Sequence, residues 1–219
     1  MIKDRIGLPR FNSVGRKVVI VISMVAGLGL FATLTAQPVP AYPPAVGIVD
    51  QARNCLDCHV DNGPWKDDSS TIIDILDKAT GESLIQDDGS FLIAAKRGET
   101  RTVLTVLGRA AGDDVPAPYR NGWVYISPDL IGSSSVSKFV PGWEVNLQMG
   151  CRLMGDKQAK YPGANITVAS MALRPGEDAE GAAIELQVML TSGESVKGKP
   201  REGMTASYFM RQVRLEVIK

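Results

Sequence analysis

The chain is poor in the residues that most often bind metals, with three cysteines and one histidine in 219 residues. A single histidine excludes bis-histidine coordination of a metal by one chain. Aromatic residues make up 6% of the sequence, and the formal net charge is zero. Residues 1–17 hold five basic residues and one acidic residue, so the remaining chain carries a net charge of −4. A mildly acidic body lacks the basic surface that neutralises phosphates, which argues against nucleic acid as a partner.

Residues 18–36 contain no charged residue and follow a basic head, a pattern typical of an export signal. The run is also close to the roughly 20 residues that span a bilayer as a helix. Two outcomes stay open. The signal is cleaved after Ala36 or Ala41, or the hydrophobic helix is kept as a membrane anchor with its basic end in the cytoplasm. Under both outcomes the rest of the chain lies outside the cytoplasmic membrane, in the periplasm or an equivalent compartment.

Four prolines within residues 37–45 indicate a stiff, extended spacer. From residue 69 onward, short runs of alternating apolar and polar residues are separated by turn sequences, as is typical of half-buried strands. This spacing predicts a mainly β body, an antiparallel sandwich or barrel, preceded by a short helix over residues 46–59 and by the N-terminal hydrophobic helix. The chain is expected to divide into an export or anchor segment (1–41), a short segment that carries two cysteines (42–68) and a β-rich domain (69–219).

The alternation also predicts which side chains are buried in the later strands. Residues 143–153 read as one strand whose apolar face holds Met149 and Cys151, so both are expected in the core. In the strand near residue 187, Met189 shares the polar face with Glu185 and Gln187. Scattered apolar side chains on a polar face are common, so this position carries no functional meaning by itself.

Residues 73–99, with the sequence IDILDKATGESLIQDDGSFLIAAKRGE, resemble the immunoglobulin-type sandwich of carboxypeptidase regulatory domains. Such domains mostly bind or pack against other chains. The resemblance therefore implies a β-sandwich and no chemistry.

Two of the three cysteines and the only histidine lie together in the stretch NCLDCHV, residues 54–60. The order Cys55-x-x-Cys58-His59 resembles the haem attachment site of c-type cytochromes. The resemblance implies one covalently attached haem c, with thioether bonds from Cys55 and Cys58 to its two vinyl groups and His59 as the proximal axial ligand of the iron. Covalent attachment of haem takes place outside the cytoplasmic membrane, in agreement with the export segment.

Three other interpretations of the motif are weaker. A thioredoxin-like redox pair needs a βαβ setting, a structural zinc site needs four ligands, and a disulfide between Cys55 and Cys58 leaves His59 without a role. In class I cytochromes c, a Gly-Pro after the motif supplies a carbonyl that accepts a hydrogen bond from the proximal histidine. Pro64 is the corresponding residue of this chain, and an ordinary Gly-Pro turn is an equally good interpretation of the same residues.

The resemblance ends near residue 66, because class I cytochromes c are helical and this body reads as strands. The chain has no methionine between His59 and Met149, so the sixth ligand of the iron is a late methionine, a lysine, another group or none. Met204 lies in a loop that contains glycine and proline, like the loop that carries the methionine ligand in class I cytochromes, and it is the first candidate. Met154, beside Gly155, is the second.

The sequence thus predicts an exported monohaem c-type cytochrome that transfers single electrons between redox partners, and not an enzyme. The expected partners are redox proteins, among them a membrane-associated respiratory or photosynthetic complex, with a membrane contact through residues 18–36 if that helix is kept. Two alternatives stay open: a five-coordinate haem sensor or haem enzyme, and a secreted β-sandwich binding module without haem.

Overall fold

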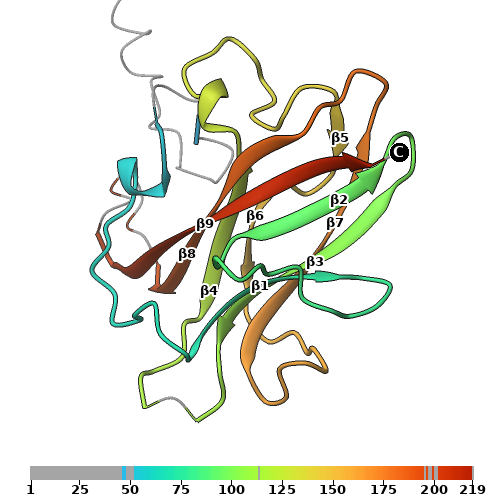
Figure 1. The fold of residues 1–219 in the computed structure, drawn as a ribbon. Helices are drawn as coiled ribbons and strands as arrows, with labels where there is room; N and C mark the ends of the chain where they lie inside the picture. Colours follow the sequence, from blue (N-terminus) through green and yellow to red (C-terminus); the bar gives the residue numbers. More distant parts are fainter. Residues whose placement is uncertain are drawn as a thin grey trace, which may run out of the picture. The chain divides into compact units, whose positions relative to one another are not determined.

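A computed structural model describes residues 46–47, 52–112, 114–194, 196, 199 and 202–218. The expected hydrophobic helix over residues 18–36 and the proline-rich spacer over residues 37–45 lie outside these residues. Within the described chain, no helix is both long and apolar enough to cross a membrane. The described residues fold mainly as β-strands (Figure 1).

The strands form two sheets, which confirms the expected mainly β body. The four-stranded sheet has the order β1-β3-β7-β5, and the five-stranded sheet has the order β2-β9-β8-β4-β6. The strands are β1 (Thr71–Asp77), β2 (Phe91–Lys96), β3 (Arg101–Arg109), β4 (Arg120–Ile126), β5 (Trp143–Val145), β6 (Met149–Leu153), β7 (Asn165–Pro175), β8 (Ala182–Gly193) and β9 (Met204–Ile218). Two short 3₁₀ turns, η2 (Cys55–Asp57) and η3 (Pro128–Leu130), complete the described elements.

One pair of neighbouring strands departs from the expected antiparallel arrangement. β2 and β9 pair in parallel, from Phe91 opposite Val213 to Lys96 opposite Ile218, and the other paired strands are antiparallel. Parallel neighbours need a long connection, and the chain between β2 and β9 supplies one. Because β2 covers only the C-terminal part of β9, no other described strand pairs with the outer edge of residues 204–212 of β9.

The five-stranded sheet carries apolar side chains on both of its faces. The inner face contributes residues such as Trp123 and Tyr125 of β4 and Val188 of β8 to the core between the two sheets. The alternate residues point to the other side and, together with Val46 and Cys55 from outside the sheet, form a second group, which we call the outer-face cluster. The cluster consists of Val46, Cys55, Val124, Ile126, Met189 and Ala206, with Ile131, Met149 and Tyr208 packed against it. An apolar outer face needs a covering segment, and part of that cover is the segment that carries the cysteine–histidine motif.

The single strand predicted over residues 143–153 is wrong. The chain forms β5 at the edge of one sheet and β6 at the edge of the other, and between them Leu147 adopts a φ of 49°. A positive φ is uncommon for a residue other than glycine and marks a sharp change of direction. The break resets the alternation, so Cys151 is exposed instead of lying in the core, and Met149 packs on the outer-face cluster.

Gly108 of β3 is expected to tolerate no side chain, because a Cβ atom there would lie 2.1 Å from the carbonyl oxygen of Asn165. Gly81 is the matched control, since its φ is 75° and nothing lies within 4 Å of an added Cβ. We predict that Gly108→Ala lowers the free energy of unfolding by about 2 kcal/mol or more through steric overlap. Gly81→Ala should cost about 1 kcal/mol through backbone strain alone. Urea denaturation measures both values, and equal losses would contradict the prediction.

Candidate functional site

The cysteine–histidine motif begins in the 3₁₀ turn η2, whose first residues are fixed by reciprocal hydrogen bonds. The side chain of Asn54 accepts from the backbone N–H of Leu56 at 2.9 Å, and the carboxylate of Asp57 accepts from the backbone N–H of Asn54 at 3.3 Å. This is a capping box, in which side chains satisfy backbone groups that a short turn leaves unpaired. Among the described residues of the helix expected over 46–59, only Cys55–Asp57 are helical.

The backbone of the turn brings both cysteines and the histidine together. The backbone N–H groups of Cys58 and His59 both donate to the carbonyl of Cys55, at 3.3 and 2.9 Å. The thiols of Cys55 and Cys58 are free. Cys55 is buried, whereas Cys58 and His59 are half-buried. The motif therefore presents two unlinked sulfur atoms and one imidazole from a single hydrogen-bonded turn.

Cys55 attaches this turn to the outer face of the five-stranded sheet. It belongs to the outer-face cluster, and its sulfur lies 3.8 Å from the side-chain oxygen of Gln187 on β8. Gln187 is itself buried, and its amide nitrogen donates to the carbonyl of Arg53 at 3.3 Å. The residues before and within the motif are thus held on β8 by one buried glutamine.

Burial also determines the charge state of the Cys55 sulfur. Loss of solvent raises the pKa of the Cys55 thiol to about 12, and the nearby Cys58 and Asp57 act in the same direction. On the same face, burial raises the pKa of Tyr208. A buried sulfur that resists ionisation is a poor nucleophile. The site therefore favours a neutral sulfur species over the thiolate of a redox pair.

After the motif, the chain follows the part of β9 that β2 leaves uncovered. The backbone N–H of Gly63 donates to the carbonyl of Ala206 at 2.6 Å. The side chains of Asn62 and Asp61 accept from the backbone N–H groups of Ala206 and Tyr208, each at 3.1 Å. A Cβ on Gly63 would lie 2.4 Å from the hydroxyl oxygen of Ser207, so this approach requires glycine.

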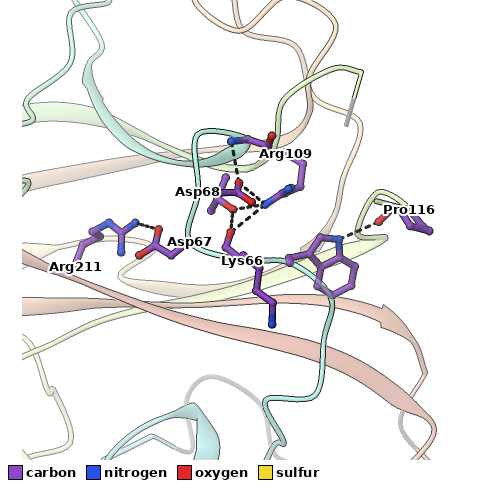
Figure 2. Close-up of polar contacts among 9 residues, drawn as sticks. Lys66, Asp67, Asp68, Arg109, Pro116 and Arg211 are labelled. Carbon is purple, nitrogen blue, oxygen red and sulfur yellow. Dashed lines mark hydrogen bonds and ion pairs between the residues drawn. The ribbon is translucent and has the colours of Figure 1, made fainter. Parts of the chain in front are cut away.

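We call residues 61–71 the anchor segment. Residues after Gly63 hold this segment in place through further contacts. Trp65 is buried in the core between the sheets, and its indole N–H donates to the carbonyl of Pro116 at 2.9 Å. The guanidinium of Arg109 on β3 donates to the carbonyl of Lys66 and to the carboxylate of Asp68, both at 3.1 Å (Figure 2). The anchor segment is therefore held at the edge of β9, in the core and on β3.

The remaining residues singled out in the sequence lie at different places. Met204 begins β9 and shares the outer face with Ala206 and Tyr208 by alternation. Met154 packs against the core between the sheets, with its sulfur 3.5 Å from the amide nitrogen of Asn165. Pro64 is exposed, between the anchored residues on either side. The roles predicted for these three residues stay predictions.

Sequence reasoning assigned no role to two methionines that the structure places in the same cluster as Cys55. Met189 of β8 is buried in the outer-face cluster, and Met149 of β6 packs against it. The signal for Met189 was present in the sequence, as an apolar residue on the polar face of an alternating strand. The burial of Met189 depends on the covering segment around Cys55, about 130 residues away in the chain. The alternation within one strand carries no information about such a distant contact.

The buried guanidinium of Arg109 is expected to hold the anchor segment more firmly than the more exposed pair between Arg211 and Asp67 (Figure 2). We predict that Arg109→Met lowers the free energy of unfolding by about 2 kcal/mol, because Lys66 and Asp68 lose a charged donor. Arg211→Met should cost less than about 1 kcal/mol, because solvent screens this pair. Denaturation of both variants tests the order, and faster amide exchange in residues 66–71 of Arg109→Met tests the location.

Alkylation of the reduced chain should distinguish Cys55 from the exposed Cys151. With a pKa of about 12, roughly one Cys55 thiol in ten thousand is ionised at pH 8, and only the thiolate reacts. We predict that iodoacetamide labels Cys151 well before Cys55, and that the labelling rate of Cys55 rises about tenfold per pH unit up to pH 11. Peptide mass spectrometry measures both rates. Equal rates at pH 8 would show that Cys55 is not buried against the sheet.

Comparison with known proteins adds no family to this description. No family model matches the chain, and no curated protein matches it. The functional interpretation therefore depends on the chemistry of the motif and on the way the β-rich body holds it.

Proposed function

We propose that this chain is an exported monohaem c-type cytochrome that transfers single electrons between redox proteins. The observation that carries the proposal is the presence of Cys55, Cys58 and His59 on one hydrogen-bonded turn with both thiols free. The turn packs on one face of a sheet, and the anchor segment holds the residues that follow it. Such a fixed site supports a cofactor whose position relative to partner proteins must be constant.

In this proposal Cys55 and Cys58 form the two thioether bonds, and His59 is the proximal ligand of the iron. The bound haem supplies a centre that accepts and releases one electron, and the residues of the chain determine its position and surroundings. A thioether is uncharged, so it suits the buried position of Cys55, where a charged sulfur is disfavoured. Pro64 is the candidate acceptor for the imidazole of His59, and Met204 and Met154 are the sequence-based candidates for the sixth ligand.

The proposed location and partners follow from the N-terminal sequence and the charge. An export signal or anchor over residues 18–36 places the haem in the periplasm or an equivalent compartment. A retained helix would keep the protein beside membrane-associated redox complexes, of which respiratory and photosynthetic complexes are the expected classes. The mildly acidic body supports protein partners and not nucleic acid.

Expression in a host that attaches haem to c-type cytochromes tests the proposal. We expect the wild-type protein to show a haem stain after denaturing electrophoresis and an intact mass larger than the polypeptide by one haem. The Cys151→Ser control should behave in the same way, because Cys151 lies outside the motif, whereas the double variant Cys55→Ser, Cys58→Ser should carry no covalent haem.

A colourless wild-type protein with the mass of the polypeptide alone would refute the proposal and favour a binding module without haem. A haem protein that is high-spin and binds CO without losing a protein ligand would instead favour the five-coordinate alternative.

A further inference from the structure

Residues 53–63, which we call the flap, carry the motif and bury little of their own surface. The flap includes the first three residues of the anchor segment, and Cys55 is its only buried side chain. Gln187 donates to the carbonyl of Arg53 at 3.3 Å, which is long for an N–H···O bond, and its other contact is with the weakly polar sulfur of Cys55. Few buried contacts and weak hydrogen bonds are marks of a segment that opens at a lower free energy than the core.

The remainder of the anchor segment is held more firmly than the flap. Trp65 is buried in the core between the sheets, and the buried guanidinium of Arg109 binds the residues that follow it. Pro64 lies between the flap and Trp65 and is exposed. The ring of proline fixes φ and leaves ψ free, and one or two loop residues can absorb the rotation of a hinged segment. The flap can therefore swing about Pro64 while Trp65 stays in the core.

A buried hydroxyl beneath the flap favours the lifted arrangement. Ser207 of β9 is 2% exposed, and its Oγ has no hydrogen-bond partner among the described residues. Gly63 covers this oxygen, because a Cβ atom built on Gly63 would lie only 2.4 Å from it. A buried polar group without a partner has lost its hydrogen bonds to water and gained none in return. Closing the flap imposes this cost, and lifting it returns water to Ser207.

A second unpartnered group lies where the flap does not cover it. Asn121 of β4 is fully buried, and neither polar atom of its side chain has a partner among the described residues. It shares a row with Ser207, because both are cross-strand partners of Leu190 on β8. Two strand spacings, about 10 Å, separate Asn121 from β9, so it stays buried when the flap lifts. The two residues therefore form a matched pair for an experiment.

We propose that residues 53–63 lift from the outer face of the five-stranded sheet about Pro64, and that this motion controls access to the sulfur of Cys55. The closed flap is the resting arrangement, in which Cys55 is buried and Cys58 is half-buried. The motion itself requires no haem. Its purpose rests on the proposed function: a thioether forms when the S–H of Cys55 adds across a vinyl C=C bond with no leaving group, and a sulfur packed against the sheet cannot reach that bond.

Amide hydrogen exchange of the purified full-length protein, resolved by residue with NMR, tests the flap. The reporters are the N–H groups of Gly63, Ala206 and Tyr208, which are hydrogen-bonded across the boundary between the flap and β9. In the wild-type protein they should exchange faster than the amides paired between β3 and β7, which report unfolding of the whole domain.

Two substitutions separate opening of the flap from global unfolding. Ser207→Ala removes a hydroxyl that is hydrated in both the open and the unfolded states, so it should slow exchange of the reporters and of the β3–β7 amides, each about five- to tenfold. Asn121→Leu removes a group that is hydrated only on unfolding, so it should slow the β3–β7 amides alone. Should Ser207→Ala not fold, Asn62→Ala, at an exposed residue, should speed exchange of the reporters because Ala206 loses its acceptor.

Two results would overturn the flap. The first is exchange of the reporters as slow as that of the β3–β7 amides in the wild-type protein. The second is a response of the reporters to Asn121→Leu equal to their response to Ser207→Ala. A wild-type protein without a haem stain would overturn the proposed function and the purpose given to the opening, whereas the exchange pattern decides the flap independently.

Discussion

The position of the cysteine–histidine motif depends on the contact between the anchor segment and the part of β9 that β2 leaves uncovered. Without the backbone hydrogen bond from Gly63 to Ala206, the motif would be a short turn on a loose chain, because a single 3₁₀ turn has too few internal hydrogen bonds to be stable alone. The side chains of Asp61 and Asn62 satisfy further N–H groups of β9 that no described strand pairs. The same contact protects an open sheet edge and positions the cysteines, so the stability of this edge and the position of the motif are coupled.

The two faces of the five-stranded sheet pack against different parts of the chain. The inner face packs against the other sheet and supplies the main core, which makes the sheet a rigid support. The outer face receives the motif, and its mixture of apolar side chains with the buried Gln187 gives a site of low polarity with one specific hydrogen-bonding group. A group bound there would be shielded from water on the side of the sheet.

The β-rich character of the body and the presence of the cysteine–histidine motif could be predicted from the sequence. The sheet to which each strand belongs could not. The apolar alternation over residues 143–153 is continuous, yet the chain changes sheets at Leu147, and Cys151 becomes exposed. Alternation reports which residues share a face of one extended strand and carries no information about a break within it. The parallel pairing of β2 with β9 was equally hidden, because it joins segments from opposite ends of the domain.

The relation among Cys55, Cys58 and His59 follows from the sequence, because they are neighbours along the chain and local spacing sets their geometry. The sequence could not show in the same way which methionine lies near these three residues. Met189 and Met204 are both far from the motif in sequence, and their distances from it depend on the register between β8 and β9 and on the path of the anchor segment. Register is fixed by hydrogen bonds and packing between remote parts of the chain, so it exists only in the folded protein.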